Sequence, residues 1–277
     1  MNEHGESARA LRASVMDKVP ASAAFVDYSD YARPAALWLV RRLLPTRVTP
    51  LHLTAAYTLA GAAAALLLAR NSYLPLAGAL LIIKSWLDAA DGSLARARQR
   101  PSRVGRFVDS LADFAVTGML FAALGFSSGR WLLCALAALC LTLQCSAFSY
   151  YYVCHRAASG GDQTSRPDES ASAGYASDNP RVLWLVHKLY GLVYSWQDAL
   201  MARVDHWLAP QRALPAGMLS AASWMGMGMQ LLVIAVCAAA GRPTWAAWAF
   251  VGPYNIYWAG LLTVRALDNR RQLRLPH

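Results

Sequence analysis

Charged side chains are scarce in this chain. Only 15% of its 277 residues are Asp, Glu, Lys or Arg, and 56% are hydrophobic. An ordinary soluble domain is about a quarter charged and at most half apolar. The surplus of apolar residues falls in runs of about 20, the length that crosses a bilayer. The composition therefore favours a polytopic membrane protein with a single domain over a soluble globular one.

Cysteines and acidic residues are also few. The five cysteines, in or at the ends of apolar runs, lack metal-ligand spacing, so we expect small buried side chains rather than disulfides. The 16 acidic residues against 26 basic ones give a net charge of +10. Basic loops on the cytoplasmic side of a membrane protein explain this excess, so no nucleic-acid partner is expected. The first 20 residues lack an apolar core, which argues against a cleavable signal peptide.

The hydrophobic runs predict an all-α fold with six transmembrane helices. We place these spans at about 51–70, 73–92, 107–128, 130–154, 214–240 and 244–265. A flexible tail is predicted over residues 1–24, and one membrane-embedded domain over 25–277.

Two further helices are expected to lie in the membrane interface. The segment 25–44 sets Trp38 and Leu39 against Arg41 and Arg42, the amphipathic pattern of an interfacial helix. A polar loop over 155–181, rich in Ser, Asp, Gly and Pro, precedes the second interfacial helix at 182–207. The Trp196-Gln197-Asp198 sequence in that helix is unexpectedly polar, and the sequence suggests no role for it.

An even number of spans puts both termini on the same side of the membrane. Arginines concentrate between the second and third spans and after the sixth, whereas the opposite loops hold few. The positive-inside rule therefore places the termini at the cytoplasmic face.

The stretch from residue 88 to 113, DAADGSLARARQRPSRVGRFVDSLAD, carries four carboxylates where the flanking runs lie in lipid. An Asp deep in a membrane segment costs on the order of 3 kcal/mol. Four unpaired ones would cost roughly 12 kcal/mol, comparable to the whole stability of a domain. Carboxylates that converge on a divalent metal ion are the simplest way to offset this cost.

Helical spacing can bring these carboxylates together. Two sets of residues each share one helix face: Asp88, Asp91, Gly92 and Ala95 in the first, and Gly105, Asp109 and Asp113 in the second. A short basic turn joins the two helices, so their acidic faces can hold one or two Mg²⁺ or Mn²⁺ ions. Arg96 adds a planar donor fork suited to phosphate. Metal, arginine and a spare carboxylate together indicate phosphoryl transfer.

The pattern D-x-x-D-G-x-x-A-R, eight residues, G-x-x-x-D-x-x-x-D resembles the signature of the CDP-alcohol phosphotransferase family, also called CDP-alcohol phosphatidyltransferases. It is met by Asp88, Asp91, Gly92, Ala95, Arg96, Gly105, Asp109 and Asp113. Eight positions at fixed spacing are far more specific than a lone glycine-rich loop. Relatives often carry Pro-Asn before the first span, whereas Leu51 follows Pro50 here, so a nucleotide contact by that Asn is missing.

The resemblance implies a CDP-linked donor, attack by an acceptor hydroxyl on phosphorus, and release of CMP. By similarity, Asp88, Asp91 and Asp109 would be metal ligands, and Asp113 a ligand and the general base. Gly92, Ala95, Arg96 and Gly105 would border the CDP moiety. Relatives also suggest a homodimer, and the compact six-span length resembles bacterial members, which implies the inner membrane.

Three other basic residues could contact an acceptor or lipid phosphate: Lys84, Arg103 and Arg33. Each has a plainer interpretation. Lys84 could pair with Asp88 one turn on or extend to the interface, Arg103 could serve only the positive-inside topology, and Arg33 could anchor in the headgroups.

The leading functional hypothesis is transfer from CDP-diacylglycerol to a water-soluble alcohol. CDP-choline or CDP-ethanolamine with diacylglycerol is the alternative within the family. A cation- or proton-coupled transporter is the alternative from another class, since carboxylates inside a membrane also mark ion pathways. The acidic residues are confined to the second and third spans and absent from the fifth and sixth, which argues against transport.

Overall fold

The computed structural model describes residues 19–161, 165, 174–209 and 214–273. Most of the tail predicted over 1–24 lies outside these residues. All regular secondary structure in the described part of the chain is helical, with no strand, which confirms the all-α class. Four long helices form its first half: α3 (Pro50–Ala69), α4 (Leu74–Ala97), α5 (Arg103–Ser128) and α6 (Trp131–Ala158). They are preceded by two short 3₁₀ turns, η1 (Ala21–Ala23) and η2 (Tyr28–Asp30), and by α2 (Arg33–Leu43).

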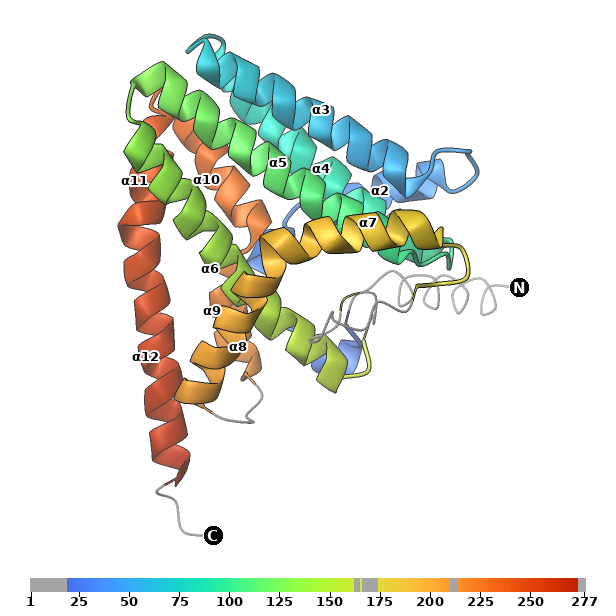
Figure 1. Cartoon of the computed structure of the whole chain (residues 1–277), viewed down its shortest axis with the longest axis vertical. Helices are drawn as coiled ribbons and strands as arrows, with labels where there is room; N and C mark the ends of the chain where they lie inside the picture. Colours follow the sequence, from blue (N-terminus) through green and yellow to red (C-terminus); the bar gives the residue numbers. More distant parts are fainter. Residues whose placement is uncertain (1–18, 162–164, 166–173, 210–213, 274–277) are drawn as a thin grey trace, which may run out of the picture.

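The second half is built from shorter pieces. After the polar loop come α7 (Pro180–Tyr190), a π-helical turn η3 (Gly191–Ser195) and α8 (Trp196–Leu208). They are followed by α9 (Ala216–Ala222), η4 (Ser223–Met225), α10 (Met227–Ala239), α11 (Thr244–Val251) and α12 (Pro253–Leu273). In Figure 1, α12 runs away from the bundle toward the C-terminus, and α7 crosses next to α5.

Local sequence explains where the central helices begin. Pro50 occupies the first turn of α3, and Thr49 and His52 form a reciprocal capping box there. Ser102 caps α5 by accepting a hydrogen bond from the backbone N–H of Gly105 at 2.9 Å. Gly129, at φ 70°, ends the same helix in the left-handed conformation.

Three of the described helices are long and apolar enough to cross a membrane: α3, α5 and α6. A fourth crossing is possible if α9–η4 and α10, bent by about 40° against each other, form one span. The prediction of six spans is thus supported in part. Helices α4 and α12 occupy the remaining predicted spans, but α4 carries Lys84, Asp88 and Asp91 in its interior, and α12 ends in a charged segment.

The structure breaks two of the predicted continuous spans. The sixth is interrupted between α11 and α12, where Gly252 leaves helical geometry directly before Pro253, which cannot continue a helix ladder. The fifth breaks at Gly226, where η2 crosses. A Cβ at Gly226 or at Gly228 would overlap with Ser29, so only glycine permits this close approach. Helix α6 also continues to Ala158, so the polar loop starts at Ser159 rather than at residue 155.

The packing places the motif helices at the centre. Helix α3 packs along both α4 and α5, while α10 covers another side of α4 and α2 lies across its motif-bearing half. One core cluster extends through α3, α4, α5, α6, α10 and α11 and includes Leu81, Leu120, Leu124 and Phe250, all fully buried. Because this core surrounds the interior of α4, its charged residues face protein rather than lipid.

Candidate active site

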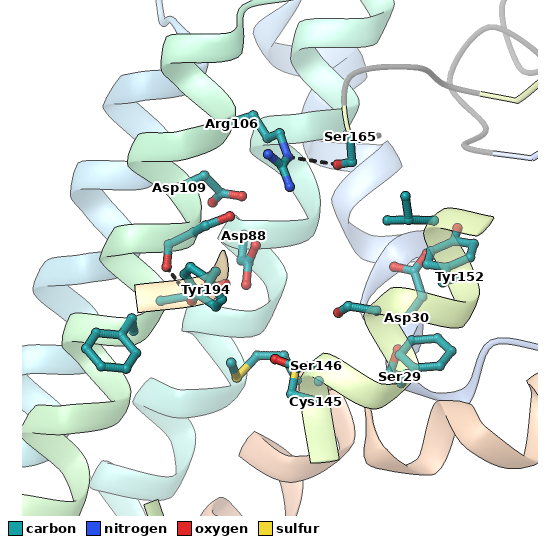
Figure 2. A pocket seen from close by; sticks show the side chains of 18 of the residues that line it. Ser29, Asp30, Asp88, Arg106, Asp109, Cys145, Ser146, Tyr152, Ser165 and Tyr194 are labelled. Carbon is teal, nitrogen blue, oxygen red and sulfur yellow. Dashed lines mark hydrogen bonds between the residues drawn. The ribbon is translucent and has the colours of Figure 1, made fainter. Parts of the chain in front are cut away.

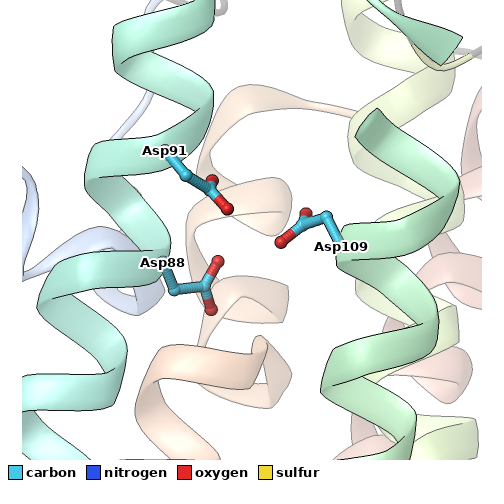
Figure 3. Close-up of side chains that lie close together, drawn as sticks. All are labelled: Asp88, Asp91 and Asp109. Atoms are coloured by element: carbon cyan, nitrogen blue, oxygen red, sulfur yellow. The ribbon is translucent and has the colours of Figure 1, made fainter. Parts of the chain in front are cut away.

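Three carboxylates converge between α4 and α5. Oxygens of Asp88, Asp91 and Asp109 all lie within 4.8 Å of one another, and no other group of described acidic, His or Cys residues meets this criterion. Figure 3 shows Asp88 and Asp91 pointing from α4 toward Asp109 on α5. The three oxygens are the hard ligands that Mg²⁺ and Mn²⁺ prefer, so this arrangement fits the predicted metal site.

Helix α3 fixes the orientation of two of these carboxylates. The Thr54 hydroxyl donates to Asp91 Oδ2 at 2.8 Å, and the Tyr57 hydroxyl donates to Asp109 Oδ1 at 2.7 Å. Tyr57 is completely buried and Thr54 nearly so. These positioning residues were missed by sequence reasoning. The spacing within the motif gives no sign of them, because they lie more than 30 positions away and meet it only through helix packing.

Lys84 lies beside the acidic group and is 1% exposed. Its ammonium donates to Asp88 Oδ2 at 2.6 Å and to Asp113 Oδ1, and it sits 4.5 Å from the ring centre of Tyr57. Asp113 is therefore held by Lys84 and is not part of the converging group. The pairing with Asp88 that the sequence suggested for Lys84 is present.

A large cavity of about 910 Å³ opens on one side of the carboxylates. It is lined by all four residues expected to border the CDP moiety, Gly92, Ala95, Arg96 and Gly105. A Cβ at Gly92 would lie 3.3 Å from the Arg96 guanidinium, so glycine leaves that arginine room. Arg33 also lines this cavity and is paired with Asp30. The size of this larger cavity and its basic lining suit a nucleotide pyrophosphate.

A smaller cavity of about 320 Å³ is lined by Asp113. Figure 2 shows Asp88 and Asp109 in its wall. The two cavities meet at a set of residues that line both: Asp30, Asp88, Ala89, Arg106, Asp109, Arg156 and Ser165. At this junction Arg106 donates to Ser165 Oγ at 2.8 Å and to the Tyr190 hydroxyl at 3.1 Å. Arg106 and Arg156 thus belong to the candidate site; the sequence pointed to Arg106 only as one of the basic residues between the second and third spans, and it did not point to Arg156.

Arg103 takes a different position from its neighbour Arg106. It is 1% exposed, its guanidinium lies 5.3 Å from the ring centre of Phe107, and among the described lining residues it borders neither cavity. Arg98, from the same basic turn, donates to the backbone carbonyls of Leu43, Thr46 and Val48 at 2.5–2.9 Å. Arg98 therefore fastens the α2–α3 connection to α4 rather than serving topology alone.

The segment before α7 is fastened to the N-terminus of α5 by Asp178. Its carboxylate accepts hydrogen bonds from the Ser102 hydroxyl at 2.6 Å and from the backbone N–H of Arg103 at 3.0 Å. It also accepts one from Tyr175 N–H at 3.0 Å. Partial burial raises the pKa of Asp178, but these hydrogen bonds outweigh it and hold the pKa below its ordinary value of 3.8. The Asp178 carboxylate is thus ionised and fixes the start of the helix that carries Arg106 and Asp109.

Comparison with known proteins agrees with this site. Residues 42–162 match the family model described as CDP-alcohol phosphatidyltransferase. The chain is also similar to the bifunctional IPC transferase and DIPP synthase of Thermococcus kodakarensis, with 42% identity over 89 residues. That alignment covers 32% of this chain and only about a fifth, 20%, of the relative. The segment that resembles this family contains all eight motif positions from Asp88 to Asp113.

Proposed function

We propose that this protein is an integral-membrane phospholipid-synthesis enzyme that transfers a phosphatidyl group from CDP-diacylglycerol to an acceptor hydroxyl and releases CMP. The observation that carries the proposal is the position of the acidic group at the junction of two cavities. The larger cavity has the family's nucleotide-bordering residues, and the smaller has the carboxylate expected to act as base. A donor and an acceptor can therefore meet at one place.

The converging carboxylates of Asp88, Asp91 and Asp109 would hold the Mg²⁺ or Mn²⁺ ion. Such an ion, when bound, neutralises pyrophosphate charge and makes the phosphorus more electrophilic. Thr54 and Tyr57 keep two of the carboxylates aimed at the same point. The second ion predicted from the sequence requires an oxygen of Asp113 as well, and Mn²⁺ titration of the purified protein would count the ions directly.

In the proposed reaction, Asp113 accepts the proton of the acceptor hydroxyl in the smaller cavity. The hydroxyl oxygen forms a bond to the phosphorus that carries diacylglycerol, and the bond from that phosphorus to the bridging oxygen of CMP breaks. Arg96 and the junction residue Arg106 are placed to bind the phosphate oxygens of the donor.

We further propose that α4 and the α11–α12 segment complete six crossings, with the site at the cytoplasmic face of a bacterial inner membrane. Charged side chains inside a membrane are tolerated where they face protein and are paired. Lys84 and its partners meet both conditions, because α3, α5 and α10 surround them.

The test is CMP release by the purified protein in detergent. Every assay contains Mn²⁺. CDP-diacylglycerol is tested with a panel of alcohols, and CDP-choline and CDP-ethanolamine are each tested with diacylglycerol. We expect turnover with CDP-diacylglycerol, its loss with EDTA and its return with excess Mn²⁺. Turnover only with the CDP-amino alcohols would replace the donor assignment, and turnover that continues in EDTA would overturn the metal requirement.

A further inference from the structure

The two cavities differ sharply in charge once their shared residues are set aside. The larger one has three basic residues of its own, Arg33, Arg96 and Arg100. Among the described residues that line only the smaller cavity, there is no Lys, Arg or His, but there are three carboxylates: Asp27, Asp113 and Asp198. The basic residues that do reach the smaller cavity, Arg106 and Arg156, stand at the junction with the larger one.

The smaller cavity is also rich in aromatic rings. Five line it without reaching the larger cavity: Phe114, Phe148, Tyr152, Tyr190 and Tyr194. Phe148 and Tyr152 lie one turn apart on α6 with stacked rings, their centres 5.6 Å apart, and Tyr190 and Tyr194 stack at 4.9 Å. In Figure 2, Ser29, Asp30 and Tyr152 lie on one side of the space, across from Asp88 and Asp109.

Helix α8 contributes one of the carboxylates in a defined position. Gln197 is buried, accepts a hydrogen bond from the Ser146 hydroxyl at 2.7 Å, and donates to the Val193 carbonyl at 2.7 Å. Ser146 itself lines the cavity, so this contact fixes α8 against the wall and places Asp198 at the same space. The polar Trp196-Gln197-Asp198 sequence, for which no local pattern indicates a role, is thus explained by this contact.

We propose that the smaller cavity receives the acceptor, and that this acceptor is an amino alcohol with a positively charged ammonium group rather than a phosphorylated alcohol. The inference rests on the proposed function and specifies its substrate class. Carboxylates and aromatic faces together are the surroundings that bind ammonium and quaternary ammonium groups. The two arginines that line this cavity, Arg106 and Arg156, lie at its junction with the larger one, over the rings of Tyr190 and Tyr152. A phosphate placed farther into the cavity would face Asp27 and Asp198, and like-charge repulsion disfavours that arrangement. The small volume suits a compact alcohol whose hydroxyl reaches Asp113 while its ammonium group lies toward the aromatic wall.

The deciding experiment compares acceptors with the wild-type chain. With CDP-diacylglycerol and Mn²⁺, CMP release is measured for choline, ethanolamine, L-serine, myo-inositol and sn-glycerol 3-phosphate. We expect the best amino alcohol to exceed sn-glycerol 3-phosphate and myo-inositol at least about 10-fold in kcat/KM, the factor that one lost charged contact produces.

The outcomes separate this inference from the proposed function. Fast CMP release with the phosphorylated alcohol or the neutral polyol would overturn the inference while the transferase activity stands. Turnover of CDP-choline with diacylglycerol, and none with CDP-diacylglycerol, would move the ammonium group from the acceptor to the donor and also overturn it. CMP release from no pair would remove the proposed function and the inference with it.

Two variants of α8 test whether the Asp198 carboxylate binds the ammonium group of the acceptor. Asp198→Asn keeps the shape of the side chain but removes its charge, so KM for the amino alcohol should rise about 10-fold with KM for CDP-diacylglycerol unchanged. Asp205→Asn is the matched control, since Asp205 lies on the same helix but pairs with Arg265 and is absent from both linings. An unchanged acceptor KM in Asp198→Asn would contradict the proposal.

Wild-type inhibition provides a measurement that does not depend on a variant folding. Tetramethylammonium should inhibit competitively against the acceptor and not against CDP-diacylglycerol. Inhibition no stronger than that by sodium chloride at equal ionic strength would count against an ammonium site.

Discussion

At the scale of single residues, the acidic centre depends on one buried cation. The Lys84 ammonium touches Asp88, Asp113 and the face of the Tyr57 ring, and its side chain is almost completely enclosed. Removing one partner from a buried ion pair leaves the other charge without compensation, which is more damaging than removing both. Lys84 is thus expected to matter for stability as well as for the placement of Asp113.

Lys84→Met should lower the free energy of unfolding by about 3–5 kcal/mol in the absence of divalent ions, because Asp88 and Asp113 lose their buried counter-charge. Thermal unfolding in detergent without added metal measures the change. Lys188→Met is the matched control, since Lys188 is exposed and stacks on Trp184, and it should shift stability by no more than about 0.5 kcal/mol. Equal melting temperatures for Lys84→Met and wild type would contradict the role assigned to Lys84.

Asp113→Asn should reduce kcat by about 100- to 10,000-fold, the range of a general base, because the amide cannot take the acceptor proton. Affinity for the Mn²⁺ ion held by Asp88, Asp91 and Asp109 should stay close to wild type, since Asp113 does not belong to that converging group. Asp109→Asn is the comparison variant and should lose metal affinity. Turnover and Mn²⁺ binding are measured on the same preparations, and substantial turnover by Asp113→Asn would remove its assignment as base.

At the scale of helices, the site depends on how the start of α5 is fixed. Ser102 caps the helix from within, and Asp178 binds its first turn from the segment before α7. Both contacts satisfy backbone N–H groups that a helix leaves without internal partners. The negative charge of Asp178 is also favourable at a helix N-terminus. Gly105, Arg106 and Asp109 follow within two turns, so this contact positions the walls of both cavities.

Asp178→Ala should lower the melting temperature at pH 7, where a cap of this kind contributes about 1 kcal/mol. The pKa of Asp178 is lowered in the folded state, so its contribution is fully present above the ordinary value of 3.8 and is lost as pH falls through the lower folded value. The gap between wild type and variant should therefore persist from pH 7 to pH 5 and close toward pH 3. Ser177→Ala is the neighbouring control, and its effect should not vary with pH. A gap that remains constant to pH 3 would exclude the ionised carboxylate as its cause.

At the scale of the whole molecule, the distribution of charge decides how the chain can sit in a membrane. Helices α3, α5 and α6 are long and apolar enough to cross a membrane by themselves. Helix α4 is long enough but carries the charged side chains of Lys84, Asp88 and Asp91. Those charges face α3, α5 and α10, so the bundle rather than the lipid surrounds them. A helix that is unsuited to cross alone can cross within such a bundle.

The proposed orientation predicts opposite labelling at the two ends of α3. In intact bacterial cells, a membrane-impermeant thiol reagent should label Ser72→Cys, beyond the end of α3, and should reach Arg47→Cys, before its start, only after lysis. Both variants are made in a background without the native cysteines. Labelling of Arg47→Cys in intact cells would place the active site on the outer face and contradict the assignment.

Much of the site could be predicted because its spacing is local. Residues three or four apart on one helix share a face whatever the rest of the chain does, so Asp88 and Asp91 had to project together, as did Asp109 and Asp113. Three of the four carboxylates predicted as metal ligands therefore converge, and the glycines predicted to border a nucleotide line the larger cavity, while the roles of both sets stay predictions. The interruptions of the fifth and sixth predicted spans were missed because mean hydropathy depends only on composition. It is not sensitive to the helix break at Pro253 or to the close approach of η2 at Gly226.

The sequence by itself determined the helical class, the family motif and the faces on which its carboxylates lie, because each follows from composition or from spacing within a few turns. Only the tertiary structure decided which distant residues complete the site. Thr54 and Tyr57 from α3, Asp27 before η2 and Asp198 from α8 reach it through helix packing. That packing depends on contacts such as those of Ser29 with Gly226 and Gly228, far apart in the chain, which no local pattern encodes.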